Sequence, residues 1–233
     1  MQNATGPIKP LLLAGGHSSR MGTRKELLVL PDGTPLFIRM ISLLHNTKPF
    51  PHLQDTHAPH VYISLRDHDK LNALCTHHTV TKIDSHNFTL NLQGREPPIL
   101  VRVLYDVDLA HSKNLEIGPA GGLLRAYQDD PEASWMVVAC DYPFMGEEGL
   151  AQLWGAFNGD LTVFYNADGF SEPLLGVWTP VALRELSRAV AEGITSPNYI
   201  VRRLKSELVR PKVEKWLMNA NTPEEWGEVL RGG

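Results

Sequence analysis

Cysteine, excess basic charge and long hydrophobic runs are all scarce in this chain of 233 residues. Its two cysteines, Cys75 and Cys140, are too few for a disulfide framework and lack the spacing of a zinc site, which suits a reducing compartment. No apolar run approaches the roughly 18 residues that a membrane span needs, and the first ten residues contain no hydrophobic signal core. A formal net charge of −4 excludes the overall basic field that favours non-specific nucleic-acid binding. We therefore expect a cytoplasmic protein that binds neither membrane nor nucleic acid.

The composition is otherwise that of a globular chain, with 42% hydrophobic and 21% charged residues. Apolar runs typical of strands alternate with amphipathic stretches typical of helices. The expected strands are 11–14, 61–65, 99–105, 135–139, 161–165, 174–178 and 216–218. The expected helices are 36–44, 69–75, 120–128, 147–157, 180–192 and 199–205, with a further helix starting at 221–225.

This alternation predicts βαβ units and hence an α/β fold, in the form of a single Rossmann-like three-layer domain over residues 1–233 with a mostly parallel sheet. Two stretches interrupt the pattern and are expected to be surface insertions. The first, 45–60, is rich in histidine and proline. The second, 79–98, contains a run at 88–92 that is compatible with a hairpin on the edge of the sheet.

A glycine-containing segment, residues 13–25, follows the first expected strand. Gly15 and Gly16 lack a Cβ, so consecutive backbone N–H groups can form an anion-binding concavity at the carboxyl edge of the sheet. Polar and cationic side chains follow within the same segment: Ser18, Ser19, Arg20 and Lys25. The spacing matches neither a Walker loop nor a dinucleotide fingerprint. An ordinary glycine turn is the alternative for the Gly-Gly pair alone, whereas the whole set favours a phosphate site.

Two acidic residues are expected at the same edge, because each comes at the end of a strand. Asp141 follows the strand 135–139, and Asp106 ends the strand 99–105. A carboxylate beside bound phosphates is a natural Mg²⁺ ligand. A turn or cap is the alternative for Asp141, and a solvated loop position is the alternative for Asp106, whose register the nearby Asp108 leaves open.

Four motifs in a fixed order carry a resemblance to a known family. They are L-A-G-G-x-S-x-R-M-G-x-x-K at 13–25, I-G-P-A-G-G-L at 117–123, C-D-Y-P-F at 140–144 and N-A-N-T-P-E-E at 219–225. Together they resemble the signature of the MobA-like nucleotidyltransferases, the relatives of molybdenum cofactor guanylyltransferase. The motifs extend over nearly the whole chain. The resemblance implies a fold like that of the nucleotide-diphospho-sugar transferases.

The resemblance also implies roles for the matching residues. The implied catalytic residues are Lys25, Arg20 and Asp141. The implied nucleotide-binding residues are Leu13, Ala14, Gly15, Gly16, Ser18, Arg20, Lys25, Asp106, Gly118, Pro119 and Gly121. Asp141 and Asn221 would hold Mg²⁺, or Mn²⁺ in its place, and helix capping ahead of Pro223 is the alternative for Asn221. A tight helix–sheet contact is the alternative for the small residues at 118–122.

The reaction implied by the resemblance is transfer of GMP from GTP to the phosphate of molybdopterin or its molybdenum-loaded form, with release of pyrophosphate. The implied partners are these substrates and, transiently, a molybdoenzyme or a cofactor-biosynthesis protein. Two positions depart from the family: Ser64 stands where an Asn is common, and Glu172 stands where a Gln or His is common. The alternatives are a cytidylyltransferase or a sugar- or alcohol-phosphate nucleotidyltransferase of the same fold, and a non-catalytic cofactor-binding chaperone.

Overall fold

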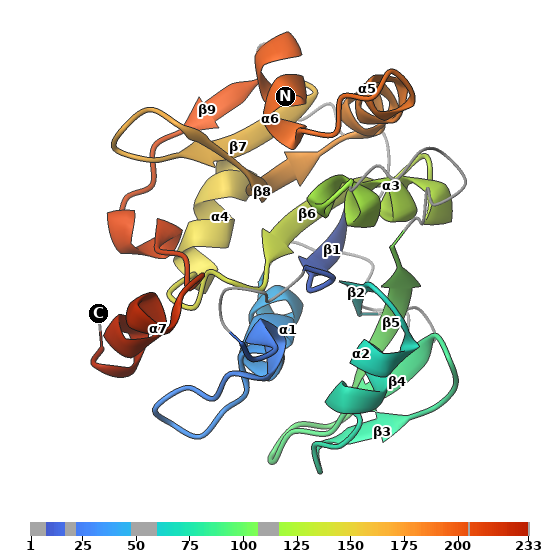
Figure 1. Ribbon diagram of the computed structural model, residues 1–233, viewed down its shortest axis with the longest axis vertical. Helices are drawn as coiled ribbons and strands as arrows, with labels where there is room; N and C mark the ends of the chain where they lie inside the picture. The colour runs from blue at the N-terminus through green and yellow to red at the C-terminus, as the bar shows by residue number, and fades with distance from the viewer. Residues whose placement is uncertain (1–7, 17–21, 48–59, 107–116, 205, 233) are drawn as a thin grey trace.

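The structure is a computed structural model that describes residues 8–16, 22–47, 60–106, 117–204 and 206–232 (Figure 1). Over these ranges, nine strands form one sheet in the order β3-β4-β5-β2-β1-β6-β8-β7-β9. The strands are β1 Ile8–Leu13, β2 Val61–Leu65, β3 Val80–Lys82, β4 Asn87–Leu90, β5 Ile99–Tyr105, β6 Ser134–Ala139, β7 Leu161–Tyr165, β8 Ser171–Trp178 and β9 Glu207–Val209. The helices are α1 Leu36–Asn46, α2 His68–Leu74, α3 Pro119–Asp129, α4 Glu147–Gly155, α5 Pro180–Ala191, α6 Pro197–Arg203 and α7 Pro223–Leu230, and the short 3₁₀ helices are η1 Lys25–Leu27 and η3 Glu214–Leu217.

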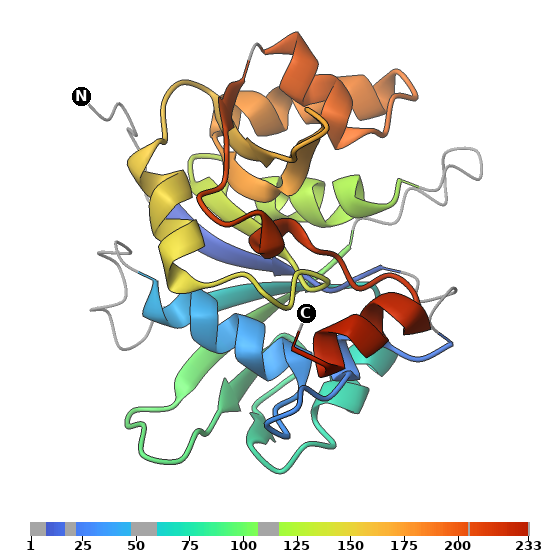
Figure 2. The same cartoon turned by 90° about the vertical axis from the view of Figure 1, so that its left-hand side faces the viewer.

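The centre of the sheet is parallel, with β5, β2, β1 and β6 side by side. Every residue of β2 and of β6 is buried, which explains why these strands read as continuous apolar runs without alternation. The chain steps from β1 through α1 to β2 in one direction and from β5 through α3 to β6 in the other. Right-handed crossovers therefore place α1 and α3 on opposite faces of the sheet (Figures 1 and 2). The predicted α/β fold is confirmed.

Both flanks of the sheet are mixed rather than parallel. β4 pairs antiparallel with β3 and with β5, so the expected edge hairpin is confirmed. On the other flank, β8 runs antiparallel to β6 and to β7, and β9 is parallel to β7. The connections β3–β4 and β7–β8 are short loops without a crossover helix, and such loops join antiparallel strands only.

The expected strand at 216–218 is wrong, because residues Glu214–Leu217 form η3. Trp216 is buried there by side-chain packing rather than by strand pairing: a Cβ added to Gly149 of α4 would lie 3.1 Å from its indole ring. The strand that follows α6 is instead β9, in which two of the three residues are exposed. No apolar run therefore marked β9 in the sequence.

Of the stretch 45–60, residues 48–59 lie outside the described part of the chain. The stretch 79–98 contains β3 and β4 and lies along one edge of the sheet (Figure 1). Across the described ranges, no helix has both the length and the apolar character needed to cross a membrane.

Candidate functional site

The described start of the glycine segment, residues 14–16, and both acids lie where the parallel strands end. The backbone N–H of Ala14, just after β1, donates to the carbonyl of Ser64 in β2 at 3.0 Å. The N–H of Asp106, just after β5, donates to the carbonyl of Leu65 at 2.9 Å. Asp141 comes two residues after the end of β6, which pairs with β1. The expectation that these residues share the carboxyl edge of the sheet agrees with the structure.

Leu13 and Ala14 are buried and anchor the start of the glycine segment. The carbonyl of Leu13 accepts a hydrogen bond from the N–H of Cys140 at 2.9 Å, and the carbonyl of Ala14 accepts one from the ammonium of Lys70 at 3.1 Å. The backbone N–H and carbonyl of Ala14 are thus both bonded within the protein and are not available to a ligand. The predicted site residues Ser18 and Arg20 lie outside the described residues.

Lys25, Asp141 and Asn221 come together although they lie far apart in the sequence. The Nζ atom of Lys25 lies 3.4 Å from Oδ2 of Asp141, and it donates a hydrogen bond to Oδ1 of Asn221. The side chains of Lys25 and Asp141 are 19% and 24% exposed, so the cluster is open to a ligand. The N–H of Ala220 donates to the carbonyl of Asp141 at 2.9 Å and holds the two segments together.

Asn221 is not the residue that caps α7. Thr222 has that role: its hydroxyl accepts a hydrogen bond from the N–H of Glu225 at 3.2 Å, and the Glu225 carboxylate accepts one from the N–H of Thr222 at 3.0 Å. This reciprocal capping box satisfies the helix start without the side chain of Asn221. The capping alternative for Asn221 is therefore excluded, and its amide oxygen faces Lys25.

The residues present fit a Mg²⁺ ion. Mg²⁺ prefers oxygen ligands and is usually held by one or two carboxylates together with phosphate and water. Asp141 supplies a carboxylate oxygen and Asn221 an amide oxygen, and both lie close enough together for one ammonium group to contact them. Among the described residues there is no group of three or more His, Cys, Asp or Glu that would suit a metal held by protein ligands alone.

Gly15 and Gly16 serve different purposes. A Cβ on Gly15 would clash with the carboxylate of Asp106, whereas a Cβ on Gly16 would meet nothing within 4 Å. Asp106 is partly buried and accepts a hydrogen bond from the hydroxyl of Ser64. Burial raises the pKa of the Asp106 carboxyl above its ordinary value, and the Ser64 hydrogen bond opposes this shift. Gly15 thus allows Asp106 to lie against the loop, while Gly16 leaves the backbone accessible.

The small residues at the start of α3 are explained largely by packing. Gly118 has a φ of +50°, a conformation that favours glycine, and Pro119 begins the helix. A Cβ on Gly122 would clash with the hydroxyl of Ser64 and would lie 2.8 Å from Cδ2 of Leu13. Tight packing of the helix on the sheet, which was the alternative to a ligand-binding role, therefore explains Gly122. Gly121 is roomier, with its Cβ position 3.6 Å from Cβ of Asp106.

Beside the cluster, Tyr142 and Glu172 form a hydrogen-bonded pair, and neither was among the catalytic, nucleotide-binding or metal residues that the motifs implied. The buried hydroxyl of Tyr142 donates to Oε2 of Glu172 at 2.7 Å. Burial raises the pKa of the Glu172 carboxyl, and the negative charge of Asp141 adds to the shift. The Tyr142 hydroxyl also has a hydrogen bond with the side chain of Asn219. In the sequence, Glu172 was marked only by standing where a Gln or His is common. Its hydrogen bond to Tyr142 could be found only from the fold.

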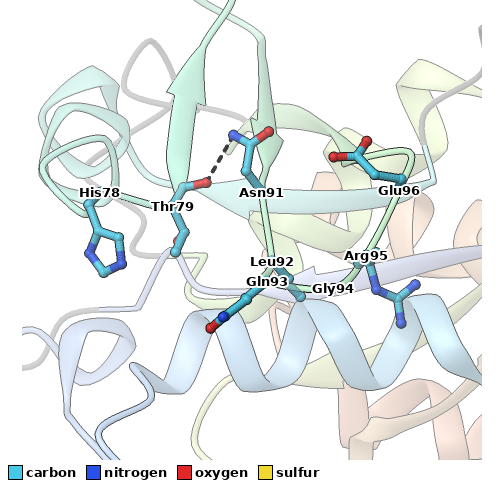
Figure 3. A pocket seen from close by; sticks show the side chains of 8 residues that line it. All are labelled: His78, Thr79, Asn91, Leu92, Gln93, Gly94, Arg95 and Glu96. Carbon is cyan, nitrogen blue, oxygen red and sulfur yellow. Dashed lines mark hydrogen bonds between the residues drawn. The ribbon is translucent and has the colours of Figure 1, made fainter.

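A cavity of about 410 Å³ lies elsewhere, beside the β3–β4 hairpin (Figure 3). It is lined by His78, Thr79, Asn91, Leu92, Gln93, Gly94, Arg95 and Glu96. The side-chain amide of Asn91 donates to the carbonyl of Thr79 at 3.2 Å. None of the predicted site residues lines this cavity, so it is separate from the cluster at the carboxyl edge.

Comparison with known proteins decides the family. A family model described as the MobA-like NTP transferase domain matches residues 10–208. This chain belongs to the MobA-like NTP transferase family. It is therefore a nucleotidyltransferase, as the four motifs predicted, and the carboxyl-edge cluster lies on the fold of that family.

Individual MobA-like relatives agree with this assignment. A molybdenum cofactor biosynthesis bifunctional protein of Synechocystis sp. is 33% identical over 116 residues, which cover 48% of this chain but only 33% of that protein. A probable molybdenum cofactor guanylyltransferase of Rhodopirellula baltica is 26% identical over 231 residues, 96% of this chain and 92% of that protein. The crystal structure of molybdopterin-guanine dinucleotide biosynthesis protein A from Archaeoglobus fulgidus matches with a TM-score of 0.62 at 21% identity, covering 96% and 97% of the two chains. At this identity the structural match shows the fold alone.

Proposed function

We propose that this MobA-like protein transfers GMP from GTP to the phosphate of molybdopterin, or of its molybdenum-loaded form, and releases pyrophosphate. The observation that carries the proposal is the meeting of Lys25, Asp141 and Asn221 at the carboxyl edge of the sheet, where β1 also ends just before Gly15 and Gly16. A cation, a carboxylate and an amide oxygen next to accessible backbone amides suit a metal-bound triphosphate. The names of the Synechocystis and Rhodopirellula relatives, which refer to the molybdenum cofactor, support an acceptor of this class.

In the proposed reaction, an oxygen of the acceptor phosphate attacks the α-phosphorus of GTP, and the bond from that phosphorus to the bridging oxygen breaks. The electron pair leaves with pyrophosphate. A phosphate monoester is already an anion at neutral pH, so no general base is needed. Catalysis then consists of positioning the two phosphates and neutralising the negative charge that develops on the leaving group.

Each group of the cluster has a part in this step. The amides that begin at Gly15, together with Lys25 and Arg20, bind the triphosphate. Asp141 and Asn221 would hold Mg²⁺, and a bound Mg²⁺ would supply positive charge to the phosphates. Lys25 contacts the oxygens of both expected metal ligands, so its ammonium would add positive charge for the phosphates at the same place.

We place the acceptor on the side of Tyr142 and Glu172. Glu172 lies beside the cluster, and its carboxylate is oriented by the buried Tyr142 hydroxyl. This position differs from the Gln or His common in the family, so we expect Glu172 to contribute to acceptor selection. The dinucleotide product must pass to a recipient enzyme, and we expect transient contact with a molybdoenzyme or a cofactor-biosynthesis protein.

The test is to incubate the purified protein with molybdopterin, Mg²⁺ and each of the four ribonucleoside triphosphates, and to measure pyrophosphate release. We expect release with GTP only. Release with CTP instead would support the cytidylyl alternative. If pyrophosphate were released only when a sugar or alcohol phosphate took the place of molybdopterin in the assay, that compound and not molybdopterin would be the acceptor. Binding of Mg²⁺·GTP without pyrophosphate from any acceptor would favour the cofactor-binding chaperone.

A further inference from the structure

Lys70 connects the two ends of the glycine-containing loop. Its ammonium lies 2.8 Å from Oε1 of Glu26 and donates to the carbonyl of Ala14 at 3.1 Å. Ala14 is the residue before Gly15, and Glu26 is the residue after Lys25. One side chain from α2 therefore joins the residue that follows β1 to a residue of η1.

Both charged groups of this contact are withdrawn from water. Glu26 is 2% exposed and Lys70 is 8% exposed. Burying two charges is costly, and an apolar pair of similar volume often stabilises a fold as well or better. An ion pair at this place is therefore not explained by stability alone. Its hydrogen bonds do fix the positions of the groups that they join, and this explains the pair.

Two directions are taken by consecutive side chains here: Arg24 and Glu26 contact helix α2, and Lys25 between them contacts the cluster. Arg24 donates from Nη1 to the carbonyl of Asp69 at 3.0 Å, and Glu26 binds Lys70, so both flanking residues are attached to α2. The middle residue, Lys25, extends the other way to Asp141 and Asn221. Helix α2 thus holds η1 on either side of the lysine that enters the site.

We propose that Lys70 and Glu26 are positioning residues, which keep the loop closed and hold Lys25 and the Gly15–Gly16 amides in place before nucleotide binds. The inference rests on the proposed function in one respect, namely that this loop binds the triphosphate. Groups that are pre-organised lose less freedom on binding, and misplacement by about 1 Å of a positioned group can cost on the order of 10²-fold. The affinity for nucleotide should therefore depend on this pair, although neither side chain enters the cluster.

The experiment replaces both charges together, because a single substitution leaves its partner buried without a counter-charge and risks unfolding. The double variant Glu26→Met/Lys70→Met is compared with the control double variant Lys9→Met/Asp130→Asn. The control removes an ion pair of 2.8 Å near the other end of the same strand β1. For each protein, three quantities are measured: the free energy of unfolding, the Kd for Mg²⁺·GTP, and hydrogen exchange of amides 14–16 and 24–28 without nucleotide.

For Glu26→Met/Lys70→Met we expect a folded protein, because no buried charge is left unpaired, with stability lowered only by the lost hydrogen bond to the Ala14 carbonyl. We also expect faster exchange of those amides and a Kd weakened by on the order of tenfold to a hundredfold. The control should keep the natural Kd and exchange rates. A natural Kd and unchanged exchange in Glu26→Met/Lys70→Met would overturn the inference. The variant Lys25→Ala distinguishes failure of this inference from failure of the proposed function. If Lys25→Ala also binds Mg²⁺·GTP with the natural Kd, the loop is not the triphosphate site. The exchange measurement needs no ligand, so it tests the positioning by Lys70 and Glu26 independently of the proposed function.

Discussion

At the scale of single residues, Gly15 and Gly16 are neighbours with opposite surroundings. We expect Gly15→Ala to displace the Asp106 carboxylate, because the new Cβ would clash with it, and to cost about 1–3 kcal/mol of stability. Gly16→Ala should leave the free energy of unfolding unchanged, because nothing lies within 4 Å of its Cβ position. Chemical denaturation of the two variants checks the prediction. Equal losses of stability would mean that Asp106 does not depend on Gly15.

A second residue-scale prediction concerns Asp141. Asp141→Asn keeps the size of the side chain but removes its charge, so we expect the fold to survive and kcat to fall by on the order of 10²-fold, as when another charge-stabilising group is removed. The rate should also require more Mg²⁺ to reach its maximum. Initial rates of pyrophosphate release across a Mg²⁺ titration measure both effects, and circular dichroism confirms folding. A natural rate and Mg²⁺ dependence would remove Asp141 from the metal site.

At the scale of secondary-structure elements, the start of α7 links helix capping to the site. Thr222 caps this helix, and the preceding residue, Asn221, contacts Lys25. We expect Thr222→Ala to lower the free energy of unfolding by about 1 kcal/mol through loss of the cap, and to raise the Mg²⁺ concentration required for activity. Denaturation and a Mg²⁺ titration test the two effects.

Thr179→Ala is the matched control for that element. Thr179 is also a capping threonine, at the start of α5, where its hydroxyl accepts from the N–H of Ala182 at 3.4 Å. Its loss should lower stability without changing the Mg²⁺ requirement. If both variants change the Mg²⁺ requirement equally, the start of α7 has no specific connection to the metal site.

At the scale of the whole molecule, stability should depend on pH through a pair of histidines that joins α1 to the sheet. The His45 and His60 rings lie 5.2 Å apart. Burial, with the charge of Arg95 and then His60, lowers the pKa of His45 from 6.5 to about 4, and burial lowers the pKa of His60 as well. Below pH 6.5 the unfolded chain therefore binds protons that the folded chain does not. We expect stability to fall as the pH drops from 6.5 to about 4.

The carboxyls of Asp106 and Glu172 contribute with the opposite sign. Burial raises their pKa values, so the folded state holds protons that the unfolded state has lost, and their contribution increases as the pH falls. Urea denaturation of His45→Leu isolates the histidine part, because this variant should lose less stability between pH 6.5 and 4 than the natural protein. The exposed His78→Gln is the control, and an equal pH dependence in His45→Leu would contradict the prediction.

Strongly patterned segments allowed much of the fold to be predicted. Strands β2 and β5 lie at the residues expected, since fully buried or regularly alternating apolar runs reflect their surroundings directly. β9 escaped prediction because an edge strand with exposed side chains needs little apolar surface. Trp216 led to the wrong prediction of a strand at 216–218, because an aromatic side chain can be buried by packing on a helix as well as in a strand.

The local motifs indicated candidate site residues, because the chemistry expected of Gly-Gly, Asp141 and Asn221 depends on their residue types. The partners of those residues were decided by the tertiary structure. Lys25 meets an acid 116 positions away and an amide 196 positions away, and Tyr142, which follows β6, meets Glu172 of the neighbouring strand β8. The sequence by itself thus determined the α/β fold, the family and the chemical groups available. Only the folded chain decided which groups meet, because contacts between distant segments depend on strand order and helix placement, and no local pattern records these.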